Sequence, residues 1–68
     1  MYEKRLRQGE HVRRFAIRET GGAWEVRAEH DSEVVKRARY DDWHRVERMM
    51  LVFATEVASL EQAGWVPD

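Results

Sequence analysis

Few side chains of this chain have the types and spacing that catalysis or metal binding requires. Asp41, Asp42 and His44 are neighbours, but the aspartates have a sufficient role in ending a strand and capping a helix. His11 and His30 fall in an expected arm and an expected turn, and nothing in the spacing brings the three histidines together. No Cys/His zinc pattern and no glycine-rich phosphate loop occurs. We therefore expect no catalytic residue, no metal site and no cofactor.

Arginines give the strongest charge pattern of the expected sheet, although the whole chain carries a net charge of −1. Glu25 and Glu29 share one face of this sheet with the arginines, and we expect Arg18 to pair with Glu25 and Arg14 with Glu29 across the hairpin, which neutralises part of the positive charge. Guanidinium groups on such a face suit phosphates and base edges, because a β-ribbon fits the major groove of DNA. A nucleic-acid face is one candidate site, and its residues are Arg14, Arg18, Arg27, Arg37 and Arg39.

A β-hairpin around Gly21-Gly22 is the first element that must position these side chains. A two-residue type I′ loop needs positive φ at both central positions, which glycine adopts without steric cost. The loop sets Glu19 opposite Trp24 and Ile17 opposite Val26, so one face of the hairpin is apolar and the other charged.

A third strand is expected at residues 34–40. A three-residue loop before it would put Ala28 opposite Val34 and keep Arg37 and Arg39 outside, whereas a two-residue loop would bury arginines. The chosen register leaves Lys36 on the core face, where an edge-strand lysine can extend outward to water.

The first eleven residues have two interpretations, a flexible arm or an extra edge strand. Tyr2 and Leu6 are the only apolar side chains there after Met1, Val12 follows directly, and Gln8-Gly9-Glu10 suggests a break. We favour the loosely ordered arm, which leaves residues 12–40 for the sheet.

Residues 43–63 are expected to form one long helix. Asp42 suits the N-cap and Gly64 suits the position after the C-cap. We expect Trp43 to anchor the helix beside Trp24 in the core. A helix of this length spans about 31 Å, and a seven-residue strand about 23 Å, so the helix should extend beyond its sheet. The apolar stripe recurs at spacings of three and four: Trp43, Val46, Met50, Phe53, Val57 and Leu60.

Length and composition favour one small α+β domain over residues 1–68, with 43% hydrophobic residues and no cysteine. The expected architecture is a three-stranded antiparallel β-meander packed against one long C-terminal α-helix.

The longest apolar run, residues 49–54, is far below the ~20 residues that span a bilayer. No signal-peptide pattern is visible, so we expect a cytoplasmic protein without a membrane partner.

The chain resembles two DNA-binding families over roughly residues 13–60. Gly21-Gly22-Ala23-Trp24-Glu25-Val26, then a basic strand from Val34 to Tyr40 and a helix from Trp43 to Leu60, is similar to plant AP2 factors and phage-integrase N-terminal arms. This resemblance implies nucleic-acid binding through the sheet. The segment Tyr40-Asp-Asp-Trp-His-Arg-Val-Glu-Arg also resembles one in small uncharacterised bacterial proteins and implies no activity.

The leading functional expectation is a non-enzymatic interaction module that acts as a homodimer through its helix, with no small-molecule substrate. The middle of the helix is apolar nearly all round, and a small core without disulfides gains from partner surface. The expected dimer contacts are Met49, Leu51, Val52 and Phe53. The alternative is a DNA- or RNA-binding domain that uses the arginine face.

Overall fold

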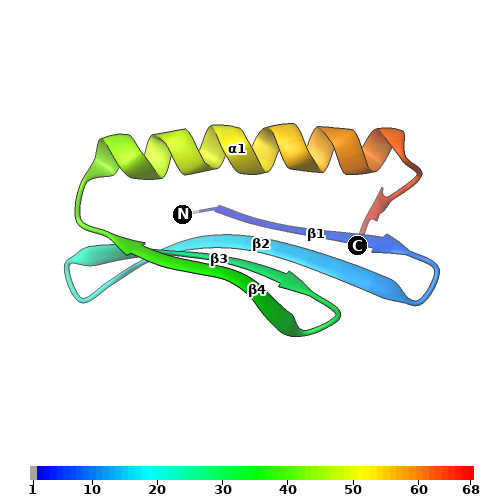
Figure 1. The fold of residues 1–68 in the computed structure, drawn as a ribbon, viewed down its shortest axis with the longest axis horizontal. Helices are drawn as coiled ribbons and strands as arrows, with labels where there is room; N and C mark the ends of the chain where they lie inside the picture. Colours follow the sequence, from blue (N-terminus) through cyan, green and yellow to red (C-terminus); the bar gives the residue numbers. More distant parts are fainter. Residues whose placement is uncertain (1) are drawn as a thin grey trace.

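The computed structural model of the protein describes residues 2–68, which form an antiparallel sheet with a helix along one face (Figure 1). The sheet order is β4-β3-β2-β1-β5, and every neighbouring pair is antiparallel. The expected α+β class with a C-terminal helix is confirmed. In chain order the elements are β1 (Tyr2–Gln8), β2 (His11–Thr20), β3 (Ala23–His30), β4 (Glu33–Tyr40), α1 (Trp43–Gln62) and β5 (Val66–Pro67).

The sheet in residues 2–68 has four main strands and a short fifth, so the expected count of three is wrong. The difference lies at the start of the chain, where β1 pairs with β2 along its whole length, from Tyr2–Ile17 to Gln8–His11. Leu6 provides the apolar anchor, since its side chain is fully buried. One buried leucine in a mostly charged segment gives a weak sequence signal, although the alternation of side chains is that of a strand.

The hairpin of β2 and β3 has the predicted register. Gly21 and Gly22 have φ of 59° and 77°, as a type I′ turn requires. Ile17 pairs with Val26, and the whole hairpin keeps this register as far as Arg13 and His30. The turn and the hydrophobic alternation agree, and both put the charged side chains on the face away from α1.

The turn between β3 and β4 differs from the prediction. Asp31 and Ser32 both have positive φ, 53° and 69°, and they form a two-residue turn instead of a three-residue loop. The register then shifts by one residue within the strands, so Ala28 pairs with Lys36 and not with Val34. For residues 36–40 the observed register differs from the expected one by two residues, so these side chains stay on their expected faces. Val34 does not, because it pairs with Glu29 on the charged face.

Both ends of α1 are capped. The Asp42 side chain accepts a hydrogen bond from a backbone N–H of the first turn at 3.0 Å. At the other end, Gly64 (φ 100°) and Trp65 donate their N–H groups to the carbonyls of Glu61 and Leu60 at 3.2 and 3.0 Å. This is a Schellman motif, which requires a residue with positive φ and turns the chain back toward the sheet.

The core lies between α1 and the facing side of the sheet. At its centre the rings of Phe15 and Phe53 pack with centroids 5.1 Å apart. Arg13 closes the core near the far end of the helix, where its guanidinium donates to Glu56 at 2.8 Å. The largest fully buried side chains are Leu6, Phe15, Ile17, Val26, Val46 and Phe53.

Trp43 is not a core residue, contrary to the expectation. Its ring packs on Trp24 with centroids 4.8 Å apart, but 43% of the residue remains exposed. Trp43 is the first residue of α1 and lies at the end of the core, so other side chains cover only one side of its ring.

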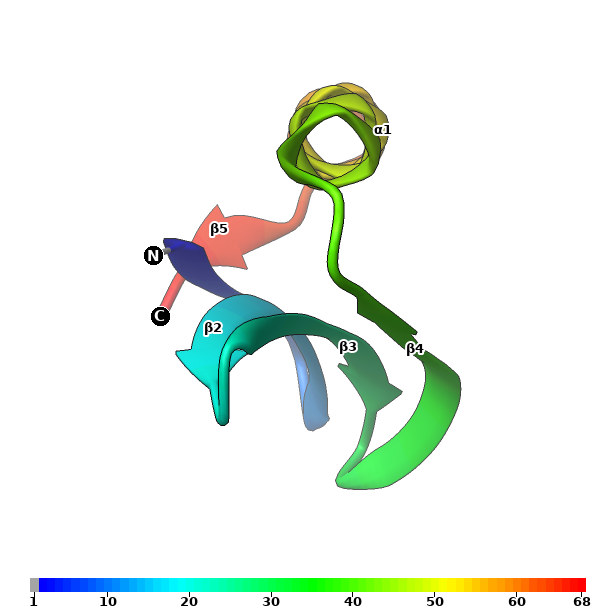
Figure 2. The same cartoon turned by 90° about the vertical axis from the view of Figure 1, so that its left-hand side faces the viewer.

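The helix does not extend beyond the sheet (Figure 1). The ten residues of β2 span about 33 Å, and the twenty residues of α1 span about 30 Å. The end-on view shows α1 over one face of a strongly twisted sheet (Figure 2). Within residues 2–68, no helix combines the length and the apolar content that crossing a membrane requires.

The different burial of two aromatic residues predicts different costs of truncation. Phe53→Ala should lower the free energy of unfolding by about 3–5 kcal/mol, because it leaves a cavity beside Phe15. Trp43→Ala should cost about 1–2 kcal/mol, because much of its ring is already in water. Urea unfolding of both variants measures this difference. If Trp43→Ala were the more damaging change, this description of the core would be wrong.

Asp68 fixes the last strand to the sheet. Its backbone N–H donates to the carbonyl of Arg5, and its carboxylate pairs with Arg5 and Arg7, each at 3.2 Å. The hydrogen bond from Arg7 lowers the pKa of Asp68 below the ordinary value of 3.8, and the charges of Arg7 and Arg5 act in the same direction. The stabilisation from these pairs is complete above that ordinary value and is lost as the pH falls through the lowered pKa.

This attachment of β5 should respond to acid and to one substitution. In an NMR titration, the Asp68 carboxyl should titrate below 3.8, and Arg7→Gln should raise its pKa toward the ordinary value because the main donor is gone. Arg39→Gln, at the opposite edge of the sheet, should leave the titration unchanged. An Asp68 pKa that does not respond to Arg7→Gln would contradict the role of this pair.

Candidate functional site

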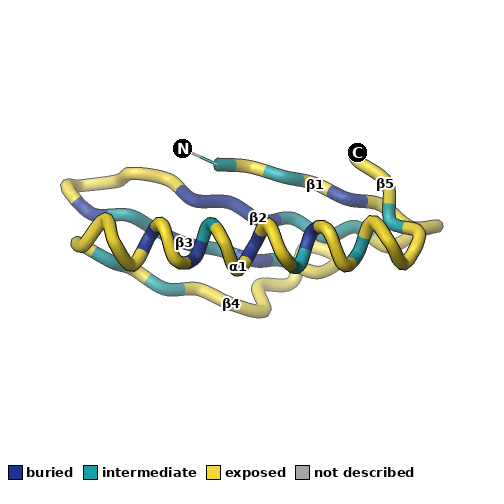
Figure 3. The backbone as a smooth tube through the Cα atoms, turned by 90° about the horizontal axis from the view of Figure 1, so that it is seen from above, coloured by how far each residue is buried: buried dark blue, intermediate teal, exposed yellow. Residues whose placement is uncertain are grey.

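An apolar groove of about 360 Å³ runs between α1 and the start of β1. It exists because α1 packs against β2, β3 and β4, and β1 lies to one side of the helix (Figure 3). Two turns of α1 and the first strand therefore provide the walls. The groove is lined by Tyr2, Glu47, Met50, Leu51 and Ala54.

The four expected dimer contacts occupy three different places. Met49 and Phe53 are buried against the sheet, 8% and 1% exposed, so they belong to the chain's own core. Leu51 is 70% exposed and lines the groove. Val52 is exposed too, but it lies 100° further round the helix, toward the flank that faces β4. Helical spacing already places Phe53 on the apolar stripe and Leu51 and Val52 away from it, and this is the sequence signal that could have separated these positions.

Tyr2 forms the floor of the groove beside the core. Its ring packs on Phe53 with centroids 6.3 Å apart. Partial burial raises the pKa of the Tyr2 hydroxyl, and the negative charge of Glu61 raises it further. Sequence reasoning missed Tyr2 because it treated the first residues as an arm. The alternation of Tyr2, Lys4 and Leu6 along one face is the signal that could have identified it.

The other candidate site is the face of the sheet away from α1. The register places the five predicted arginines there and adds two from β1, Arg5 and Arg7, which sequence reasoning missed with the strand itself. Glu3, Glu25, Glu29 and Asp68 share this face, and the seven arginines outnumber these four carboxylates. We call this surface the arginine face.

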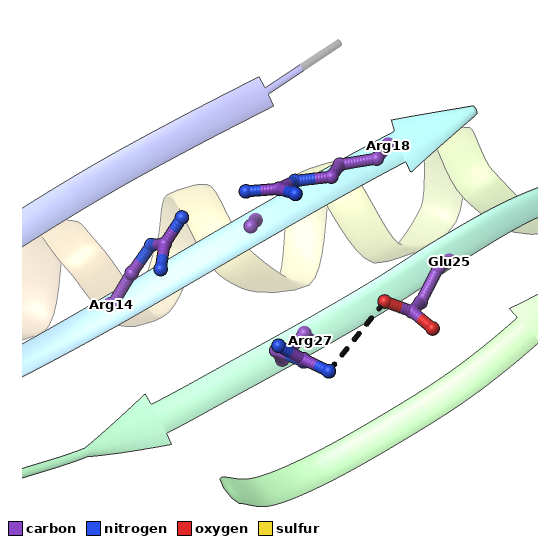
Figure 4. A pocket seen from close by; sticks show the side chains of 5 residues that line it. Arg14, Arg18, Glu25 and Arg27 are labelled. Carbon is purple, nitrogen blue, oxygen red and sulfur yellow. Dashed lines mark ion pairs between the residues drawn. The ribbon is translucent and has the colours of Figure 1, made fainter. Parts of the chain in front are cut away.

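A small hollow lies near the middle of the arginine face (Figure 4). Ala16 forms its floor and is only 5% exposed, because the stems of the surrounding arginines cover it. The hollow has room for about one water molecule, so it cannot enclose a larger ligand. Four charged side chains surround it: Arg14, Arg18, Arg27 and Glu25.

Ion pairs on the arginine face differ from those predicted between β2 and β3. Arg14 does approach Glu29, at 3.9 Å, but its closer partner is Glu3 of β1. The predicted Arg18–Glu25 pair is absent from the ion pairs of residues 2–68. Glu25 instead accepts from Arg37 of β4 at 3.2 Å. Burial leaves the Nε–H of Arg27 without a hydrogen-bond partner within residues 2–68.

Two of the three histidines come together, a meeting that their spacing in the chain does not indicate. His11 at the start of β2 and His30 at the end of β3 have ring centroids 6.0 Å apart, and Asp31 lies between them. His44 is in the first turn of α1, far along the chain from this pair, and contacts Glu47 at 3.9 Å. The antiparallel pairing of β2 and β3 produces this meeting, because it brings the first residues of β2 next to the last of β3.

Comparisons of the chain with protein-family models, with curated proteins and with solved structures give no match. The resemblance to the two DNA-binding families therefore stays a prediction, and the groove and the arginine face are the two features of the molecule that point to a function.

Proposed function

We propose that the protein is a non-enzymatic interaction module that acts as a homodimer, and that the groove between α1 and β1 is its interface. One observation carries this proposal: Leu51 is 70% exposed at the edge of an apolar groove. Exposed apolar surface that adjoins a hollow is typical of an interaction site. A domain of this size without cysteine also gains stability when a partner covers such surface.

A second copy of the chain is the partner we propose, because it brings its own exposed apolar side chain, Leu51, to an apolar groove. In a two-fold arrangement, residue contacts are reciprocal, so Leu51 of each copy can enter the groove of the other. Met50, Ala54 and Tyr2 would then pack around each inserted leucine. Burying a leucine side chain contributes about 1.5–3 kcal/mol, and the two-fold axis supplies this contribution twice.

Charges beside the groove also favour a second copy. Glu47 lines the groove, and Glu61 lies close enough to Tyr2 to raise its pKa. Lys4 shares the helix-facing side of β1 with Tyr2 and has no ion-pair partner within residues 2–68. An antiparallel approach of two helices would bring the acidic flank of one copy to Lys4 of the other.

Neighbouring residues of α1 provide a matched test of this interface. Sedimentation equilibrium at micromolar concentration should give the mass of two chains for the parent protein and for Val52→Lys. Leu51→Lys should weaken dimerisation by about tenfold or more, because it puts an ammonium group into an apolar groove. Both positions are exposed, so circular dichroism should show that both variants fold.

Two outcomes would contradict the proposal. If the parent protein folds cooperatively and sediments as a single chain, the groove is not a dimer interface. Equal loss of the dimer in Val52→Lys and Leu51→Lys would place the interface elsewhere on the helix.

Nucleic-acid binding by the arginine face is a second candidate function. The observation in its favour is the excess of guanidinium groups: Arg18 and Arg39 have no carboxylate partner within residues 2–68. Arg39 donates to the carbonyl of Thr20 at 3.3 Å and so keeps most of its donors free. The other five arginines of the face are engaged with carboxylates, which weakens this candidate relative to the homodimer.

A salt titration with mixed-sequence DNA duplex tests the second candidate. Binding through phosphates should weaken steeply as salt increases, and Arg18→Ala with Arg39→Ala should reduce the salt slope by about 2. The control is Arg45→Ala with Arg48→Ala on α1, which removes the same charge from the opposite side of the molecule. No binding at low salt, or equal losses in both double variants, would exclude the arginine face as a nucleic-acid site.

A further inference from the structure

His11, His30 and Asp31 bring three metal-ligating side chains to one end of the sheet. One ligand atom from each lies within 4.8 Å of the other two. The Asp31 Oδ2 atom is 2.8 Å from His11 Nδ1 and 3.5 Å from His30 Nε2. The β1–β2 turn, the β3–β4 turn and the last turn of α1 all lie at this end of the molecule (Figure 1).

Asp31 is held firmly in the position that faces both imidazoles. Its Oδ1 atom accepts the N–H of Val12 at 2.8 Å, and its own N–H donates to the carbonyl of Val12 at 2.8 Å. These two hydrogen bonds tie the β3–β4 turn to β2 and hold Asp31 at a φ of 53°. The oxygen that remains, Oδ2, is the one directed at His11 and His30. A carboxylate oriented by a backbone N–H is the outer-shell support that metal ligands usually have.

Two imidazole nitrogens and one carboxylate oxygen are a donor set that suits Zn²⁺. Bonds of about 2.0–2.1 Å to a tetrahedral ion place neighbouring ligand atoms about 3.3 Å apart. The distance from Asp31 to His30 already matches this separation, and the shorter one to His11 is that of a hydrogen bond. A metal ion would replace the hydrogen bond between His11 and Asp31. The exposed His11 side chain can adjust its distance to Asp31 by about half an ångström, and the two imidazole nitrogens, which lie within 4.8 Å of each other, would be drawn to the same ion.

We propose that His11, His30 and Asp31 form a binding site for a divalent transition metal ion, Zn²⁺ foremost, with water in the fourth position. The bound ion would join the start of β2 to the β3–β4 turn. It would also lie close to Trp65, whose ring is edge-on to His30 with centroids 6.3 Å apart. The proposed metal site shares no residue with the groove, so its test does not depend on whether the protein is a homodimer.

The three tryptophans make Co²⁺ a position-specific probe of this site. Added to the full chain, paramagnetic Co²⁺ should broaden the indole N–H signal of Trp65 at one equivalent of metal. Trp24 and Trp43 pack together at the start of α1, about 30 Å from its end, so their signals should persist. An excess of diamagnetic Zn²⁺ should displace Co²⁺ and restore the Trp65 signal, because both ions would compete for the same three ligands.

Single substitutions test whether the three proposed ligands are the residues that bind the metal ion. His11→Gln and His30→Gln should each weaken Zn²⁺ affinity, measured by calorimetry, at least tenfold, and Asp31→Asn should do so without disturbing the turn. His44→Gln removes an exposed histidine outside the cluster and should leave the affinity unchanged. Absence of Zn²⁺ binding, equal broadening of all three tryptophan signals, or full affinity after His30→Gln would each overturn the proposal.

Discussion

A single helix has to cover a sheet that is wider than the helix. Five strands at a spacing of about 4.8 Å make a sheet about 19 Å wide, whereas a helix with its side chains is about 10–12 Å across. α1 packs against β2, β3 and β4, which accounts for the buried core around Phe15 and Phe53. The facing side of β1 is left with the groove around Tyr2 and Leu51. The proposed dimer interface is thus the part of the core that one helix leaves uncovered.

Because side chains alternate along each β-strand, the two faces of the sheet have different compositions. Toward α1 the strands present apolar residues, while away from it they present a network of arginines and carboxylates that includes β4, β1 and the C-terminal Asp68. Exposed ion pairs of this kind contribute little each, and here they link strands that are distant in the sequence. The histidine cluster lies beyond the end of this pattern, where β2 and β3 stop pairing and Asp31 turns the chain.

Local signals predicted the hairpin and the helix, and long-range packing decided the rest. Gly21-Gly22 fixed one register, and Asp42 with Gly64 marked the helix ends, because each effect acts within a few residues. The β3–β4 turn was misjudged because a two-residue turn in an unbroken ladder would bury arginines, and the register shift between Ala28 and Glu29 that avoids this was not foreseen. The pairing of β1 with β2 and the meeting of His11 with His30 depend on residues far apart in the chain, and no local pattern specifies such partners. Local signals existed for two other features: the alternation of β1, and the helical spacing that places Leu51 and Phe53 on different sides of α1.

The contact of Leu51 across the two-fold axis is the most direct test of this account. A sample that mixes isotope-labelled and unlabelled chains allows isotope-filtered NMR to record contacts between copies only. We predict signals from the Leu51 methyl groups of one copy to the Tyr2 ring and the Met50 side chain of the other. A spectrum in which Leu51 contacts only its own chain and water, in a folded protein at the same concentration, would contradict it.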